Sequence, residues 1–170
     1  MTIRSRVFCL TLLGIAGAIG LSMVGYWQVR SAAGGGGPAL PASAGAIRHH
    51  MEADMMHDAL RGDVYSALLA KTPDDHRATQ ADLKEHAESF RAALTELASI
   101  PLPVEARSSI ESARPALDHY IKAAQELASQ APSDRARAES LLPRFMTAFG
   151  ELETRMGEIS EQLEAVAAQA

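Results

Sequence analysis

Apolar residues recur at alternating steps of three and four along most of the chain after residue 45. This spacing is typical of helices that bury one face against other helices. It runs without a miss through Leu83, Ala87, Phe90, Leu94 and Leu97, through Ile110, Ala113, Leu117, Tyr120, Ala124 and Leu127, and through Leu142, Phe145, Phe149, Leu152, Met156, Ile159, Leu163 and Val166. No alternation of period two persists, so the pattern predicts an all-α protein.

Helix breakers divide this region into four expected helices. The first covers residues 46–71, the second ends near Ser99, the third ends near Gln130, and the fourth opens at Pro132-Ser133-Asp134. Thr72, followed by proline and two acids, is a strong N-cap for the second helix. Short connections make neighbouring helices antiparallel, which predicts an up-down-up-down four-helix bundle. The fourth helix, about 36 residues long, is expected to overhang the others by roughly three turns.

An uncharged apolar run, residues 7–29, precedes the helical region. As a helix it reaches about 34 Å, enough for the ~30 Å hydrocarbon core of a bilayer. Two arginines within residues 1–6 precede it, and Tyr26 and Trp27 stand at its far end. This predicts a single-pass anchor in a bacterial inner membrane, with residues 1–6 in the cytoplasm and the bulk of the chain in the periplasm.

Residues 30–45 are rich in glycine and proline and predict a linker between the anchor and a periplasmic bundle of residues 46–170. Ser31-Ala32-Ala33 and Ala42-Ser43-Ala44 resemble secretory cleavage sites, so a removed signal is the alternative to an anchor. A signal's apolar core is usually about 7–15 residues long, shorter than this run, which favours the anchor.

The first helix breaks the apolar pattern between Asp54 and Val64, where acids, a histidine and an arginine crowd together. Two buried seams are open to it: Ile47, His50, Asp54, His57, Arg61, Val64 and Leu68, or Met51, Met55, Asp58, Gly62, Tyr65 and Leu69. Either seam brings ionisable groups toward the interior, which is costly unless they are paired. Pairing of Asp54 with His57, or of Asp58 with Arg61, would make a polar layer that sets the register of a bundle or dimer.

Metal or non-covalent haem is one alternative for this region. It would use His50, Asp54 and His57 along one helical face, or His57 with His86 and His119 at about one level of the bundle. Histidines grouped on helices are more often solvated than ligating, so we expect neither a metal nor another cofactor.

Composition argues against several other functions. The net charge of -5 and pI near 5.7 come without a basic patch and argue against nucleic acid. The single cysteine, Cys9, excludes an intrachain disulfide, covalent haem attachment and a thiolate metal site. The His57-Asp58 dipeptide lacks the second ligand set of a metal-dependent phosphohydrolase, and no nucleophile stands beside a base, so we do not expect an enzyme.

A small-ligand site is the remaining reading of the first helix. The guanidinium of Arg61 is a fixed donor fork for carboxylates, and bundles often bind ligands between helices. The candidate ligand-binding residues are His57, Asp58, Arg61 and Arg114.

Two strings carry a family resemblance. Met55–Val64 (MMHDALRGDV), with one anchor and an exported bundle, resembles the N-terminal sensor region of bacterial methyl-accepting chemotaxis proteins, and Phe145–Glu153 (FMTAFGELE) stands where these receptors have their last sensor helix. The resemblance covers essentially the whole chain after the linker. It implies a homodimeric membrane receptor whose periplasmic bundle binds a small molecule and whose last helix carries the signal inward.

Such receptors continue into a second membrane span, a HAMP linker and a cytoplasmic coiled coil that controls a histidine kinase. This chain stops at Ala170, and Gly34–Gly37 interrupts a direct helical link from anchor to bundle. We therefore expect a chemoreceptor-like sensor module without the second span and signalling part. The alternative is a stand-alone anchored bundle with a structural, partner-binding or metal-binding role.

Overall fold

The computed structural model describes residues 39–169, which form four helices: α2 (Ala39–Leu69), α3 (Pro73–Ser99), α4 (Val104–Gln130) and α5 (Arg135–Ala167). The described residues contain no strand, which confirms the predicted all-α class for this part of the chain. None of the described helices has the length and hydropathy of a membrane span. The expected anchor, with Tyr26 and Trp27, lies outside the described residues.

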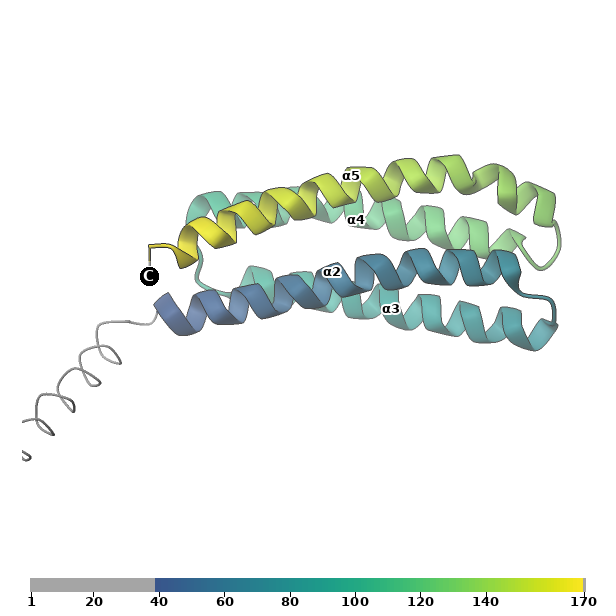
Figure 1. Ribbon diagram of the computed structural model, residues 1–170, viewed down its shortest axis with the longest axis horizontal. Helices are drawn as coiled ribbons and strands as arrows, with labels where there is room; N and C mark the ends of the chain where they lie inside the picture. Colours follow the sequence, from purple (N-terminus) through teal and green to yellow (C-terminus); the bar gives the residue numbers. More distant parts are fainter. Residues whose placement is uncertain (1–38, 170) are drawn as a thin grey trace, which may run out of the picture. The chain divides into compact units, whose positions relative to one another are not determined.

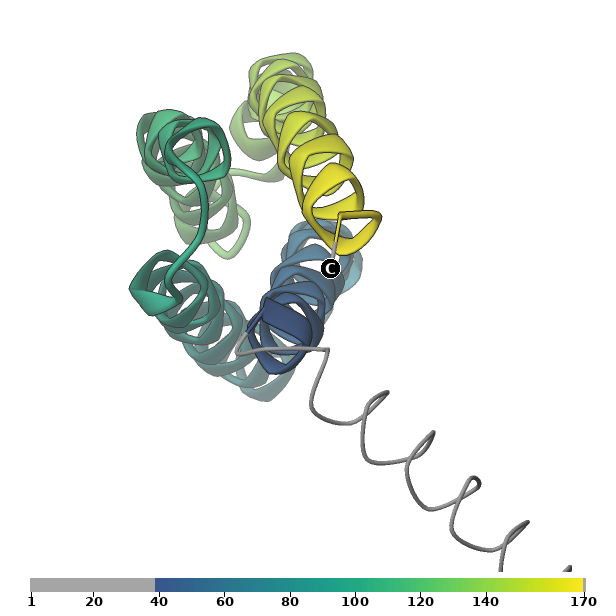
Figure 2. The same ribbon diagram turned by 90° about the vertical axis from the view of Figure 1, so that its left-hand side faces the viewer.

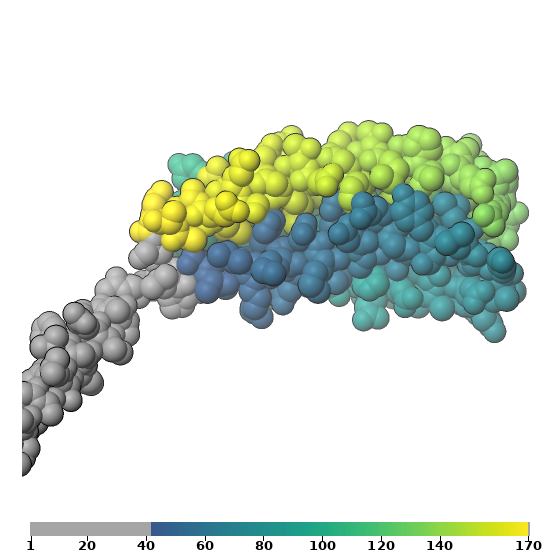
Figure 3. Space-filling model, in the orientation of Figure 1, coloured from purple at the N-terminus to yellow at the C-terminus, as the bar shows by residue number. Residues whose placement is uncertain are grey.

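The four helices form an antiparallel bundle in up-down-up-down order, as the short connections predicted (Figure 1). Viewed from the end, α2 lies beside α3 and α5, and α4 stands diagonally opposite (Figure 2). The start of α2 and the end of α5 lie at the same end of the bundle (Figure 1). In the space-filling view α2 crosses the front of the bundle below α5, with one side open to solvent (Figure 3).

Local sequence explains where α3 and α5 begin. The Thr72 hydroxyl accepts a hydrogen bond from the backbone N–H of Asp75 at 3.1 Å, and the Asp75 carboxylate accepts one from the Thr72 N–H at 3.1 Å. This capping box satisfies two N–H groups that the helix leaves without partners. The hydrogen bonds from Thr72 lower the pKa of the Asp75 carboxyl. Asp134 caps α5 through the N–H of Arg137 at 2.9 Å.

The first helix begins at Ala39, earlier than the predicted Ala46. Pro41 falls in its first turn, where the backbone N–H has no helical partner to lose, so the proline does not break it. Gly45 costs about 1 kcal/mol relative to alanine inside a helix. Ser43 and Ala46 on either side of it are buried in the bundle.

Because α2 starts earlier than predicted, it is nearly as long as α5. α2 has 31 residues and α5 has 33, whereas α3 and α4 have 27 each. The overhang predicted for the last helix alone is therefore wrong, because α2 extends almost as far as α5.

The core is one continuous apolar cluster through all four helices. The seams predicted for the last three helices are confirmed: the residues named for α3 and α4 are all buried, and those of α5 are buried or packed against the core. In α2 neither predicted seam is right. Its buried residues are Ser43, Ala46, Ala53, His57, Leu60, Asp63, Val64, Ala67 and Leu68, so the first predicted seam is met only at His57, Val64 and Leu68. Small residues occupy the first half of this face, and the step of seven from Ala46 to Ala53 is bridged by the half-buried His50.

The capping box predicts that a threonine-to-alanine substitution lowers the free energy of unfolding more at the cap than elsewhere in α3. Thr72→Ala should lower the free energy of unfolding by about 1 kcal/mol, because it leaves an N–H of the first turn of α3 without a partner. Thr95→Ala is the matched control, since the exposed Thr95 hydroxyl donates only to the Arg91 carbonyl inside α3. Urea unfolding of the full chain measures both changes, and equal losses would contradict the role of the cap.

Candidate functional site

His57 lies at the centre of the bundle with 3% of its surface exposed. Its imidazole stacks on the Phe149 ring of α5, with 4.1 Å between ring centroids and 12° between planes. Tyr120 of α4 meets it edge-on at 5.2 Å, and Phe90 of α3 lies at 6.3 Å. With Phe145, which stacks on Tyr120 at 5.2 Å, these residues form what we call the aromatic cluster. Each helix contributes at least one ring to it.

Tyr120 ties the cluster to the backbone of α2. Its hydroxyl donates a hydrogen bond to the backbone carbonyl of His57 at 2.8 Å, across the diagonal of the bundle. Burial raises the pKa of the Tyr120 hydroxyl far above its ordinary value, so the hydroxyl keeps its proton at any physiological pH. The contact fixes α4 against α2 at the level of His57.

The imidazole of His57 has an unsatisfied nitrogen. Nε2 is fully buried, and no group in the described part of the chain hydrogen-bonds to it. Burial lowers the pKa of His57; the charge of Asp58, the backbone of Phe149 and the more distant Asp54 and Glu153 oppose this in part. The net lowering favours a neutral ring in the folded bundle. A solute could reach Nε2 only if the helices separated, so His57 is not positioned for direct ligand contact.

Asp58 and Arg61 form the ion pair that the sequence suggested. The Arg61 guanidinium contacts the Asp58 carboxylate at 2.8 Å, and its carbon lies 4.5 Å from the centre of the Phe149 ring. The Arg61 side chain is 38% exposed and Asp58 64% exposed, so the pair is accessible from solvent. Arg61 therefore joins the outer surface of α2 to the same phenylalanine that stacks on His57.

Arg114 does not join this group. Its guanidinium donates to the Glu111 carboxylate at 2.9 Å within α4. No hydrogen bond, ion pair or ring contact among the described residues connects Arg114 to His57, Asp58 or Arg61. The structure thus brings three of the four candidate residues together around Phe149 and places the fourth elsewhere.

The histidines considered for a shared metal site have separate environments. His86 contacts the Asp63 carboxylate of α2 at 2.7 Å, and His119 contacts Glu151 of α5 at 3.3 Å. Neither is in ring contact with His57 among the described interactions. Within residues 42–169 no group of three or more histidine, cysteine or acidic side chains is arranged to hold a metal ion.

His50 lies one heptad before His57 on the buried face of α2. Its Nδ1 is also buried without a hydrogen-bond partner among the described residues, and burial lowers the pKa of its imidazole against the opposing charge of Asp54. The Asp54 side chain is exposed. The face of His50, Asp54 and His57, considered as an alternative metal site, is therefore divided between interior and surface.

Asp63 is a buried acid whose role the sequence did not reveal. Burial raises the pKa of its carboxyl, and the hydrogen bond and charge of His86 oppose that rise. The pair connects α2 to α3 beyond the aromatic cluster. A histidine in the following helix is a weak signal by itself, because only the packing shows which acid it faces.

A surface groove of about 600 Å³ lies between α4 and α5. Its walls are mainly polar or small, and are formed by Ser112, Pro115, Ala116, His119, Glu151, Thr154, Arg155 and Glu158. The polar groups have partners across or along the groove, including His119 with Glu151 and Arg155 with Glu158 at 3.0 Å. None of the four candidate ligand residues lines it.

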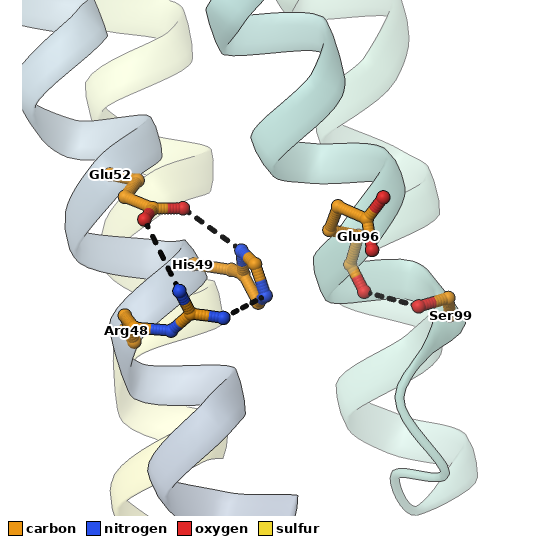
Figure 4. Close-up of polar contacts among 5 residues, drawn as sticks. All are labelled: Arg48, His49, Glu52, Glu96 and Ser99. Carbon is orange, nitrogen blue, oxygen red and sulfur yellow. Dashed lines mark hydrogen bonds and ion pairs between the residues drawn. The ribbon is translucent and has the colours of Figure 1, made fainter.

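A smaller groove of about 300 Å³ lies between α2 and α3. Figure 4 shows its polar end, where His49 points from α2 toward α3 beside Glu96. The His49 ring contacts Glu52 at 2.9 Å and Arg48 at 3.0 Å. Because arginine can only donate, Nε2 of His49 accepts and Nδ1 donates to Glu52. Every ring nitrogen here is satisfied, in contrast to His57.

No protein-family model, curated protein or solved structure matches this chain. The functional argument therefore depends on the fold and on the geometry around Phe149.

The Tyr120 hydrogen bond predicts a difference between two tyrosines. Tyr120→Phe should lower the free energy of unfolding by about 1 kcal/mol, because a buried hydroxyl-to-carbonyl bond is lost. In Tyr65→Phe, the hydroxyl lost is exposed and donates to the Met146 sulfur at 3.6 Å, so the change should stay within about 0.5 kcal/mol. Urea unfolding of the full chain compares them, and equal effects would mean that the buried bond contributes nothing specific.

Proposed function

We propose that this chain is the sensor module of a membrane-anchored chemoreceptor of the methyl-accepting type, and that Arg61 binds a small molecule carrying a carboxylate. The observation that carries this proposal is the meeting of two segments. Met55–Val64 and Phe145–Glu153, the two strings that resemble these receptors, are joined through the stack of His57 on Phe149.

Several contacts join the first and last helices of the bundle. Phe149 of α5 contacts both His57 and Arg61 of α2, and the Tyr65 hydroxyl donates to Met146 one turn away. In the receptors that the sequence resembles, the last sensor helix carries the signal. A ligand that moves Arg61 would act directly on α5 through Phe149.

The ends of the bundle also support a receptor arrangement. Because α2 starts and α5 ends at the same end of the bundle, an anchor before α2 and a second span after α5 would enter the membrane from that end (Figure 1). The anchor at residues 7–29 and the periplasmic location of the bundle remain part of the proposal.

The Asp58 carboxylate shows how a ligand carboxylate could bind to Arg61. Its carboxylate already occupies the Arg61 fork at 2.8 Å. An exposed ion pair of this kind contributes about 0–1 kcal/mol, so a ligand carboxylate can replace Asp58 at small cost. The Phe149 ring beneath keeps the guanidinium in place during the exchange.

The proposal predicts that Arg61 determines a ligand response. We would measure Tm of the full chain in detergent micelles against a panel of amino acids, dicarboxylates and hydroxy acids. A ligand at about 100 times its Kd should stabilise the chain by about 2.7 kcal/mol and raise Tm by several degrees. Arg61→Ala and Arg61→Lys should both abolish the rise, because lysine lacks the two-donor fork. Arg77→Ala, at an exposed arginine of α3, is the matched control.

A chimera tests the signalling half of the proposal. The chain would be fused ahead of the second span and cytoplasmic coiled coil of a chemotaxis receptor with known kinase output. A ligand that raises Tm should change kinase activity in the chimera and not in its Arg61→Ala variant. If no panel member stabilises the chain, while affinity purification returns one stoichiometric protein, the alternative of a partner-binding anchored bundle replaces the sensor.

The second proposed partner is another copy of this chain. The described residues expose few large apolar side chains, and all but Val104 lie on α2: Ile47, Met51, Met55, Tyr65 and Leu69. With Asp58 and Gly62 they form a stripe at three-four spacing, and no atom lies within 4 Å of a Cβ placed at Gly62. Such a stripe suits packing against an identical helix. We propose a homodimer in which α2 packs against α2.

Dimerisation predicts a sharp effect of charge on this stripe. Met55→Lys should raise the dimer dissociation constant by about tenfold or more, because it places a charge on each side of the interface. Val104→Lys introduces the same charge at an equally exposed apolar residue of α4 and should leave the constant unchanged. Sedimentation equilibrium of the detergent-solubilised chain measures both. A monomer at every concentration would remove the homodimer from the proposal.

A further inference from the structure

We propose that the proton is itself a ligand of this bundle: protonation of His57 separates α2 from α5 and so changes the state of the sensor. The inference rests on the sensor function proposed above. It concerns a group different from Arg61, so the two can fail independently.

His57 differs from the paired histidines of the bundle. The chain has six histidines, and three of them contact a carboxylate: His49, His86 and His119. In each of these three, a ring nitrogen lies within hydrogen-bond distance of a carboxylate oxygen. His57 instead packs against one aromatic ring from each of α3, α4 and α5, and its Nε2 is buried without a hydrogen-bond partner among the described residues. A proton on Nε2 would add a donor at an atom without a hydrogen-bond partner among the described residues, and a positive charge that burial disfavours more than the Phe149 backbone and the nearby acids favour it.

The acids that act on His57 lie on α2 and α5. On α2 the charged groups near His57 are Asp54, Asp58 and Arg61. Tyr120 of α4 and Glu153 of α5 are the titratable groups on the two helices opposite. From α3 the uncharged Phe90 faces the ring, and the His86–Asp63 pair lies further along. The Asp58 and Glu153 side chains lie at the surface on the helices that flank the stack. Water and these acids would solvate an imidazolium that moved outward between α2 and α5.

The direction of the pH dependence follows from burial. Desolvation lowers the pKa of His57 in the closed bundle, and the nearby acids only partly oppose it. The open or unfolded chain, with an ordinary histidine pKa near 6.5, therefore binds the proton more tightly. Stability of the closed form is complete above about pH 6.5 and is lost progressively as the pH falls below it.

Protonation of His57 would act on its stack with Phe149, which joins the first and last helices. The rings of His57 and Phe149 are nearly parallel at 4.1 Å, and Arg61 already places a cation on the Phe149 ring. A second cation at the same ring would be repelled by the first. Outward movement of His57 would break the stack and release α5 from α2 at its midpoint.

Spin labels on the two helices measure the movement directly. In a Cys9→Ser background, Ser66→Cys on α2 and Thr147→Cys on α5 place labels on exposed positions near the Tyr65–Met146 contact. The full chain in detergent micelles would be compared by pulsed electron spin resonance at about pH 7.5 and about pH 5. We expect a longer and broader label-to-label distance at the lower pH.

The variants assign the effect to His57. His57→Phe and His57→Asn, one apolar and one polar, cannot titrate, and in both the distance should be the same at the two pH values. His76→Asn removes a histidine outside the cluster and should leave the wild-type response intact. A wild-type distance that does not change with pH, or a change that persists in either His57 variant that folds, would overturn the proton switch.

The chimera described above separates this inference from the sensor function. A His57-dependent distance change with a kinase that ignores pH supports the switch and counts against the sensor. A pH-independent distance with a kinase that still responds to a carboxylate overturns the switch and leaves the sensor function standing.

Discussion

The stack of His57 on Phe149 is the contact on which the arrangement of the four helices depends. It brings α2 and α5 together at their midpoints, and Tyr120 and Phe90 close the other two sides. Apolar seams are tolerant of sliding, because leucine and alanine pack at many levels. Aromatic rings do not tolerate sliding in this way, because they must meet face-to-face or edge-to-face and one hydroxyl must reach one carbonyl. The aromatic cluster therefore sets the level at which the helices match.

The same contact leaves Nε2 of His57 without a hydrogen-bond partner among the described residues. A buried nitrogen without a hydrogen bond costs roughly 1–3 kcal/mol, which a purely structural core would avoid by using a carbon ring. The Tyr120 hydroxyl, by contrast, donates its proton to the His57 carbonyl. The bundle thus carries one unsatisfied histidine at the position where the first and last helices meet. That placement connects the proposed ligand site at Arg61 and the proposed proton switch at His57 to one phenylalanine.

The charged surface contributes much less to this arrangement. Pairs such as Arg91 with Asp118 join neighbouring helices but are about half exposed or more. Exposed pairs of this kind contribute about 0–1 kcal/mol each and weaken further with salt. Asp63 with His86 is the interhelical pair closest to the core, because the Asp63 side chain is only 11% exposed. The apolar seams hold the helices together, and the aromatic cluster aligns them.

The sequence by itself determined the class of fold, the antiparallel order and the buried faces of α3, α4 and α5, because apart from the exposed Val104 at the start of α4 their large apolar residues lie on one face. It also placed His57, Asp58 and Arg61 in one stretch. Only the tertiary structure decided the buried face of α2, where Ala46 and Ala53 face inward while Met51 and Met55 remain outside. The physical reason is volume: beside the large rings of the other three helices, small residues fill the remaining space, and hydrophobicity along one helix cannot report the size of its neighbours.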